Sequence, residues 1–244
     1  MKKPLIIGNW KMNKTNTEAK AYFDEFKQLV PGASKWVGIG VPFTCIQLAN
    51  KYRNFATCAQ NLHHEEKGTH TGEISAEILV DLKVKYVLVG HSERRAAGEP
   101  DAEIAKKLKL ALTHGITPVL CVGETRAERE AGETKAVISK QIEGALEGME
   151  KVKGVIVAYE PVWAISDGSG SSPTASEEQI QEAHTLIKKL VSKRLSSPKI
   201  LFGGSVNEKN ATSLAQIQNV HGFLVGGASL DAKRFALLCN SFNA

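Results

Sequence analysis

Residues 85–123 read KYVLVGHSERRAAGEPDAEIAKKLKLALTHGITPVLCVG, and this stretch contains the unit that decides the fold. An apolar, β-branched run at residues 85–90 is followed by a segment of helical period at 101–115, and then by a second apolar run at 117–123. Both runs are apolar throughout rather than alternating, which is typical of strands covered on both faces. The stretch therefore predicts two parallel strands joined by a helix.

The same unit repeats along the whole chain of 244 residues. The expected strands are residues 5–10, 37–41, 55–60, 85–90, 117–123, 155–160, 199–204 and 222–227. The expected helical segments are residues 15–30, 43–52, 75–82, 101–115, 135–150, 176–195, 208–217 and 231–240. No linker rich in Pro or Ser separates two halves, and no G-x-G-x-x-G opens a helix. The pattern favours a closed (β/α)₈ barrel, with residues 1–244 as a single domain, over an open doubly wound sheet.

Charge and cysteine content narrow the class of protein. The formal net charge of +5 is mild, and lysines interspersed with apolar residues, as at 105–112, indicate a solvated helix face rather than a nucleic-acid-binding stripe. The four cysteines are far apart and form no C-x-x-C pair, which indicates a reducing compartment. The apolar run near the N-terminus is too short for a signal peptide or a membrane span. We therefore expect a cytoplasmic protein without nucleic-acid or membrane partners.

Polar residues and glycines follow five of the expected strands. In a (β/α)₈ barrel the loops after the C-terminal ends of the strands form one face, where active sites gather. The residues at these ends are Asn9, Lys11, His91, Ser92, Glu93, Glu160, Gly203, Gly204, Ser205, Gly226 and Gly227. Glycine pairs after two adjacent strands let the backbone approach a ligand closely and predict a phosphate site, although tight turns remain the alternative.

His91 and Glu160 are the candidates for acid–base chemistry. We expect burial at a dry barrel mouth to raise the pKa of Glu160, which would make it a base near neutral pH. An imidazole opposite the carboxylate could polarise a carbonyl group. We expect Glu93 to pair with Lys11, which would add a positive charge beside the ligand. The alternatives are a capping or ion-pairing role for Glu160 and a structural role for His91.

Seven motifs resemble the triosephosphate isomerase family, in order and spacing, over the whole chain: GNWKMN, TGEIS, GHSERR, CVGET, AYEPVWAI, GGSVN and GFLVGGASL. The resemblance implies a TIM-barrel isomerase of glycolysis and gluconeogenesis that interconverts dihydroxyacetone phosphate and D-glyceraldehyde 3-phosphate. It implies that Glu160 transfers a proton between neighbouring carbons and that neutral His91 polarises the carbonyl group. Lys11 and Asn9 would stabilise the oxyanion, and no cofactor or metal is implied.

The resemblance also implies a phosphate site and a homodimer. The expected phosphate ligands are Lys11, Asn9, Ser166, Ser205, Gly226 and Gly227. The loop at residues 61–75 is long and polar, as functional loops are, and would reach across a two-fold axis with Thr71 at its tip to support the site of a second subunit. A floppy loop in a monomer is the alternative. His63 and His64 lie in this loop without a third ligand at metal spacing, so no metal site is expected.

The chain departs from the family pattern at three places. Residues 96–99 read AAGE where the family has an aromatic pair, and Phe202 stands where the family has a tyrosine. The segment SDGSGSS at 166–172 is longer and richer in Gly and Ser than the family's lid tip. We expect an altered lid and impaired turnover. The alternatives are a phosphate-binding barrel that turns over poorly and an aldolase-like barrel, which would need a Schiff-base lysine inside a strand.

Overall fold

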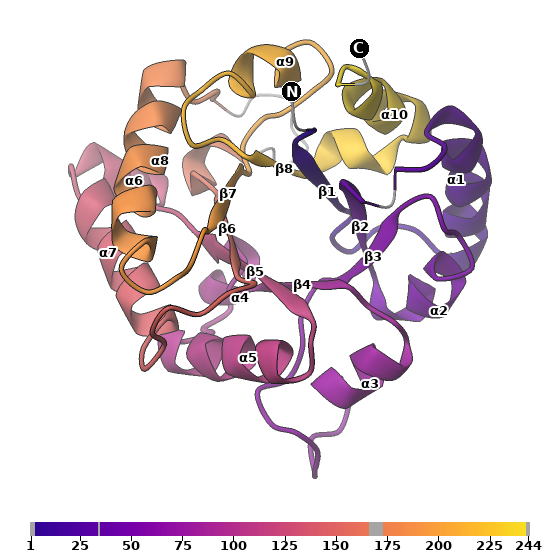
Figure 1. Ribbon diagram of the computed structural model, residues 1–244, viewed down its shortest axis with the longest axis horizontal. Helices are drawn as coiled ribbons and strands as arrows, with labels where there is room; N and C mark the ends of the chain where they lie inside the picture. Colours follow the sequence, from indigo (N-terminus) through magenta and orange to yellow (C-terminus); the bar gives the residue numbers. More distant parts are fainter. Residues whose placement is uncertain (1–2, 34, 166–172, 243–244) are drawn as a thin grey trace.

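The strands of this chain form a closed parallel barrel. The structure is a computed structural model that describes residues 3–33, 35–165 and 173–242. The strands follow one another in chain order around the barrel, and β8 pairs with β1 to close it (Figure 1). The strands are β1 Leu5–Asn9, β2 Val37–Val41, β3 Ala56–Ala59, β4 Tyr86–Val89, β5 Thr117–Val122, β6 Ile156–Tyr159, β7 Lys199–Phe202 and β8 Gly222–Val225. Each lies within its expected range, so the prediction of a (β/α)₈ barrel is confirmed.

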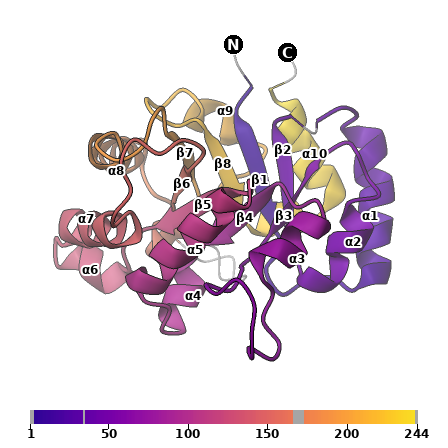
Figure 2. The ribbon, with the colours of Figure 1, turned by 60° about the horizontal axis from the view of Figure 1, so that its bottom comes forward.

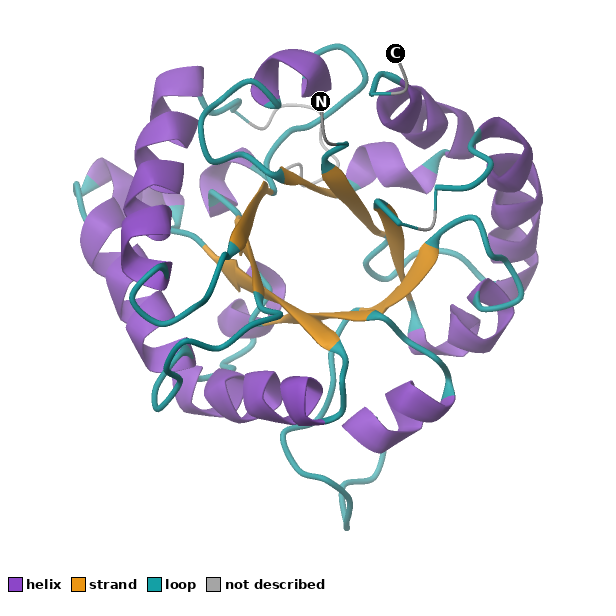
Figure 3. Ribbon diagram, in the orientation of Figure 1, coloured by secondary structure: helices purple, strands orange, loops and turns teal. Residues whose placement is uncertain are grey.

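Helices surround the barrel on all sides (Figure 3). The α-helices are α1 Asn16–Leu29, α2 Ile46–Ala49, α3 Ala76–Asp81, α4 Ser92–Ala96, α5 Asp101–Thr113, α6 Arg126–Glu130, α7 Thr134–Ala145, α8 Glu177–Val191, α9 Ala211–Leu214 and α10 Ala232–Asn240. Short 3₁₀ helices are η1 Phe43–Cys45, η2 Val162–Ala164 and η3 Gly227–Leu230. The helices α4 and α6 were not expected from the sequence. Within the described ranges, no helix combines the length and apolar character needed to cross a membrane.

Two hydrophobic cores hold the barrel together. The first fills the inside of the barrel and consists of Leu5, Ile7, Ala56, Cys58, Tyr86, Leu88, Val119, Cys121, Ile156, Ala158, Leu201 and Leu224. The second lies between the strands and the helices, and it includes the large buried rings of α1 and α10. Strands such as β4 and β6 are therefore buried on both faces, and their residues are apolar in both registers, as the sequence predicted.

One lysine of α5 contradicts the expectation of a solvated helix face. Lys106 and Lys109 are exposed, but Lys107 is only 2% exposed. Its ammonium group contacts the carboxylate of Glu99 and lies 2.9 Å from Oδ1 of Asn61. Burial of a charge is tolerated when the charge is paired and hydrogen-bonded. Lys107 therefore ties α5 to the loops after β3 and β4.

The loop between β3 and α3 projects away from the barrel (Figure 2). Its base is closed where the backbone N–H of His63 donates to the carbonyl of Ile74, 2.8 Å away. Thr71 lies beyond this closure and is exposed. We call residues 61–75 the arm.

Candidate active site

A cavity of about 370 Å³ lies at the C-terminal ends of the strands. Nine of the predicted site residues line it: Asn9, Lys11, His91, Glu160, Gly203, Gly204, Ser205, Gly226 and Gly227. Glu93 lies directly beside it, and Thr71 belongs to the exposed arm instead. Ser166, together with the rest of the segment 166–172, lies outside the described residues. The barrel thus brings together side chains that are far apart in the sequence.

Lys11 enters the cavity from a constrained backbone. Its φ is +53°, a left-handed conformation that non-glycine residues rarely adopt. Two contacts hold this conformation: the N–H of Lys11 donates to Oδ1 of Asn9 at 3.0 Å, and Nε2 of Gln60 donates to the carbonyl of Lys11 at 2.9 Å. Strain of this kind persists only when the surroundings hold it, and it gathers at functional sites.

The ammonium group of Lys11 is paired. Its Nζ lies 2.8 Å from Oε1 of Glu93, so the expected ion pair is confirmed. The Lys11 side chain is 25% exposed and that of Glu93 is 59% exposed. The pair is therefore partly solvated, and it orients the lysine while contributing little to stability.

His91 joins the end of β4 to the start of α4. It is the N-cap residue of this helix, and its Nδ1 accepts a hydrogen bond from the backbone N–H of Glu93 at 3.3 Å. Because Nδ1 is an acceptor, the ring proton resides on Nε2, which faces Oε1 of Glu160 at 3.2 Å. Burial lowers the pKa of His91, but the carboxylates of Glu160 and Glu93 raise it by more, so the pKa lies above its usual value.

Glu160 follows β6 and is only 4% exposed. Burial raises its pKa, but His91, Cys121 and Lys11 lower it by more, so the pKa lies below its usual value. The expected rise in the pKa of Glu160 is therefore wrong, because His91, Cys121 and Lys11 together outweigh desolvation. The carboxylate is ionised at neutral pH and can accept a proton. Its Oε2 is buried and has no hydrogen-bond partner among the described residues.

The two glycine pairs play different parts. A Cβ atom on Gly226 or Gly227 would meet no atom of the described residues within 4 Å, so the backbone here faces the cavity. A Cβ atom on Gly203 would lie 2.7 Å from Cγ of Glu160, and so this glycine makes room for the carboxylate side chain. The cavity is therefore lined by bare backbone on its β8 side and by the acid–base pair on the other.

Several residues around the cavity were not predicted from the sequence. Asn207 and Arg234 line it, and Arg234 places a guanidinium group near the glycine pairs, 3.9 Å from Glu208. Glu124, at the end of β5, is fully buried and accepts a hydrogen bond of 2.9 Å from Nε1 of Trp163. It also pairs with Arg129 at 3.0 Å. A buried carboxylate in this position anchors the segment that follows Glu160.

Phe202 lies next to this segment. It is 2% exposed, and its ring packs against Gly204, where a Cβ atom would lie 2.4 Å from Cζ. The rings of Tyr159 and His184 lie 6.4 Å and 6.3 Å away. The sequence departure at this position thus leaves a well-packed ring that has no hydroxyl group.

A (β/α)₈ barrel with an acid–base pair, a lysine and a backbone-lined pocket at one mouth defines an enzyme that moves protons on a small polar substrate. A model of the family described as triosephosphate isomerase matches residues 4–242. Proteins named triosephosphate isomerase are similar over nearly their whole length. The protein from Aquifex aeolicus is 44% identical, covering 98% of this chain and 99% of its own. The proteins from Thermus thermophilus and Alkaliphilus oremlandii are each 41% identical, covering 98% of this chain and 98% and 100% of their own. The chain belongs to the triosephosphate isomerase family.

Proposed function

We propose that this chain interconverts dihydroxyacetone phosphate and D-glyceraldehyde 3-phosphate, a step of glycolysis and gluconeogenesis, with Glu160 as the base. The observation that carries the assignment of roles is the contact of 3.2 Å between Oε1 of Glu160 and Nε2 of His91. It joins an ionised carboxylate to a ring that holds a proton on the facing nitrogen. No cofactor takes part in the proposed chemistry.

The reaction proceeds by two proton transfers at carbon. Glu160 takes a proton from the carbon next to the carbonyl group, and Nε2–H of His91 donates to the carbonyl oxygen, which gives an enediolate. Lys11 and Asn9 line the same cavity. We assign them to stabilise the negative charge that develops on this oxygen. Glu160 then returns the proton to the neighbouring carbon, and His91 transfers the hydroxyl proton between the two oxygens. The carboxylate and the ring end in their starting states.

Substrate binding makes Glu160 a stronger base. His91 is the main group that lowers the pKa of Glu160, and burial opposes it. When His91 donates to the substrate oxygen instead, burial dominates and the pKa of Glu160 rises. A general base works best when its pKa lies close to the working pH. When His91 donates to the substrate and no longer to Glu160, the carbonyl group is polarised and the Glu160 carboxylate becomes a stronger base.

The phosphate group is assigned to the β7 and β8 side of the cavity. Bare backbone at Gly226 and Gly227 supports this assignment, because it allows N–H groups to approach an anion closely. Ser205 lies at the same side, and its hydroxyl group donates to the carbonyl of Ala164 at 3.1 Å. Lys11 and Arg234 add positive charge. Only the resemblance to the family supports the proposed contact between Ser166 and the phosphate group.

A homodimer is proposed from the surface beside Lys11. Met12 is 97% exposed, which is unusual for a large apolar side chain next to an active site. Phe43, in η1, and Ile78, in α3, are further exposed large apolar residues, at 38% and 45%. We assign the arm, with Thr71 near its tip, to cover this surface in a second copy of the chain. The four free cysteines are buried, which supports the cytoplasm as the location.

The second candidate function is slow isomerisation in which part of the enediolate intermediate decomposes before it is converted into product. Phe202 favours it, because the ring lacks the hydroxyl group that a tyrosine would offer to a closing lid. An intermediate exposed to water loses its phosphate and gives methylglyoxal. The amount of methylglyoxal formed per isomerised product separates the two outcomes.

A coupled assay with D-glyceraldehyde 3-phosphate tests the proposal. The wild-type chain should turn over, and Glu160→Gln should lose roughly 100-fold to 10,000-fold in kcat, because it removes the base and keeps the volume. Binding of a phosphate-bearing substrate analogue should persist in this variant. An inactive wild-type chain, or a Glu160→Gln variant that keeps more than about a tenth of the activity, would contradict the assignment.

A further inference from the structure

The end of β5 supports the backbone of Glu160. The N–H of Glu160 donates to the carbonyl of Val122 at 2.8 Å. One residue further, a Cβ atom on Gly123 would lie only 1.9 Å from the carbonyl oxygen of Glu160. The Cα atom of Gly123 is therefore in direct contact with the peptide group of Glu160. A shift of Gly123 must shift Glu160.

On the side that faces β4, Gly123 lies beyond the last residue pair of the two strands. The β4–β5 ladder ends at the pair Val89 and Leu120, and the chain then turns away at Gly90, whose φ is +68°, into α4. No backbone of β4 therefore continues alongside Gly123. A buried peptide group in this position needs other partners for its N–H and its carbonyl.

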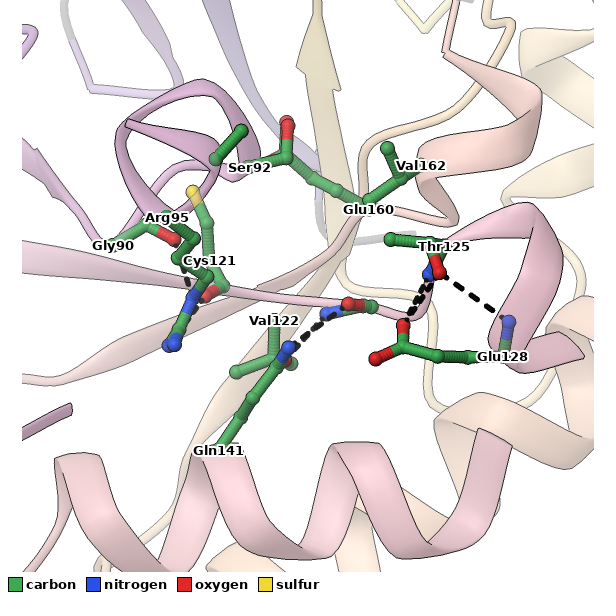
Figure 4. A pocket seen from close by; sticks show the side chains of 12 residues that line it. Gly90, Ser92, Arg95, Cys121, Val122, Thr125, Glu128, Gln141, Glu160 and Val162 are labelled. Atoms are coloured by element: carbon green, nitrogen blue, oxygen red, sulfur yellow. Dashed lines mark hydrogen bonds between the residues drawn. The ribbon is translucent and has the colours of Figure 1, made fainter. Parts of the chain in front are cut away.

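Gln141 provides both partners. Its Oε1 accepts from the N–H of Gly123 at 2.8 Å, and its Nε2 donates to the carbonyl of Gly123 at 3.0 Å. One side-chain amide thus replaces the missing strand with a two-point contact that fixes position and orientation. Gln141 belongs to α7, whose buried face is anchored by Ile138 and Ile142. In Figure 4, Gln141 reaches from this helix to the end of β5, and Glu160 lies on the opposite side of the strand.

Side-chain packing around Glu160 does not replace the support that Gln141 gives through Gly123. A cavity of about 240 Å³, lined among others by Cys121, Gly123, Gln141 and Glu160, lies beside the carboxylate (Figure 4). Side chains next to a cavity lack contacts on that side and are held less firmly than in a filled core. The position of Glu160 on this side therefore depends on the backbone of Gly123.

We infer that Gln141, which lies outside the substrate cavity, is a positioning residue that holds Glu160 in place through Gly123. The inference rests on the proposed role of Glu160 as the base. It assigns to Gln141 an effect on the chemical step and not on phosphate binding, because the glycine-lined pocket is on the β7 and β8 side. A misplacement of about 1 Å of a reacting group costs up to roughly 100-fold in rate.

The test compares Gln141→Met with Ile138→Val on the same helix. Methionine keeps a similar volume and removes both hydrogen bonds, whereas the Ile138 variant loosens the buried face of α7 and keeps both hydrogen bonds between Gln141 and Gly123. We expect Gln141→Met to lower kcat about 10-fold to 100-fold with KM changed less than about 3-fold. Ile138→Val should leave kcat within about 2-fold of wild type. Gln141→Glu, which keeps the acceptor for the N–H of Gly123, should recover part of the loss.

The pH profile gives a second readout. His91 holds the pKa of Glu160 below its usual value across 3.2 Å, so a carboxylate displaced from His91 should titrate at higher pH. The acidic limb of the kcat/KM profile should therefore move to higher pH in Gln141→Met and stay unchanged in Ile138→Val. A purely structural loss would move neither limb.

A double variant separates this inference from the assignment of the base. If Gln141 acts through Glu160, then adding Gln141→Met to Glu160→Gln should not lower the residual rate further. A full additional loss of about 10-fold or more would overturn the inference while leaving Glu160 as the base. A Gln141→Met variant with wild-type kcat, or with only KM raised, would overturn it as well. An active Glu160→Gln variant would instead refute the proposed function.

Discussion

His184 should make the folded chain sensitive to mild acid. Its ring is fully buried in α8 beside Tyr159 and Phe202, and its Nδ1–H donates to the carbonyl of Asn219 at 3.1 Å. Burial lowers the pKa of His184 from 6.5 to about 4. In the unfolded chain the same group titrates near its usual value, about 6.5. The unfolded state therefore binds the proton more readily.

The sign and size of the effect follow from this difference. Because the folded-state pKa is the lower one, the contribution of His184 is fully present above pH about 6.5 and is lost as the pH falls toward about 4. The full difference corresponds to about 3 kcal/mol of unfolding free energy. At pH 5 about 2 kcal/mol of it should already be lost.

Urea unfolding of the wild-type chain and His184→Asn between pH 7.5 and 5 measures this contribution. Asparagine keeps an N–H group for the carbonyl of Asn219 but does not titrate. The variant should be less stable at pH 7.5, because it leaves space in the core, and should lose about 2 kcal/mol less than wild type on acidification. Protein concentration must be held constant, since a dimer is stabilised by association. Equal losses in both chains would refute the reasoning.

Three further predictions concern the site and its surroundings. Glu93→Gln should lower kcat only about 2-fold to 5-fold, because the ion pair between Lys11 and Glu93 is partly exposed. Lys11→Met should lower kcat far more, and equal losses in the two variants in steady-state assays would contradict this prediction. Phe202→Tyr should lower the yield of methylglyoxal about 2-fold to 10-fold, because a new hydroxyl group can hold the lid; an unchanged ratio of methylglyoxal to isomerised product argues against it. Replacing residues 67–71 by a short turn should give a monomer with reduced activity in sedimentation and kinetic assays, and a fully active monomer would exclude the proposed role of the arm.

The strands of the barrel could be predicted because each forms a short apolar run between polar loops. The helices α4 and α6 could not be predicted by periodicity, since neither is longer than five residues. A local signal did exist for α6, where Thr125 and Glu128 form a capping box. Lys107 was misjudged because the residues that pair with it, Asn61 and Glu99, come from other loops.

The active site could be predicted only in part, because some of its contacts also join residues that are distant in the sequence. Glu160, His91 and Lys11 follow strands directly, so their convergence at one mouth follows from the barrel itself. Gln141 lies within a helix and carries no motif, and its partner Gly123 is 18 residues away. The direction of the pKa shift of Glu160 was also beyond the sequence, because it depends on a distance to His91 that only the folded chain defines.

Proton transfer at carbon in heavy water tests the central claim most directly. The wild-type chain, isomerising dihydroxyacetone phosphate in D₂O, should incorporate solvent deuterium at C2 of the glyceraldehyde 3-phosphate formed, because a proton held by Glu160 exchanges with the solvent. Glu160→Gln should slow both isomerisation and exchange by roughly 100-fold to 10,000-fold. Isomerisation without deuterium, as in a hydride shift, or unchanged exchange in Glu160→Gln, would contradict the assignment of Glu160 as the base.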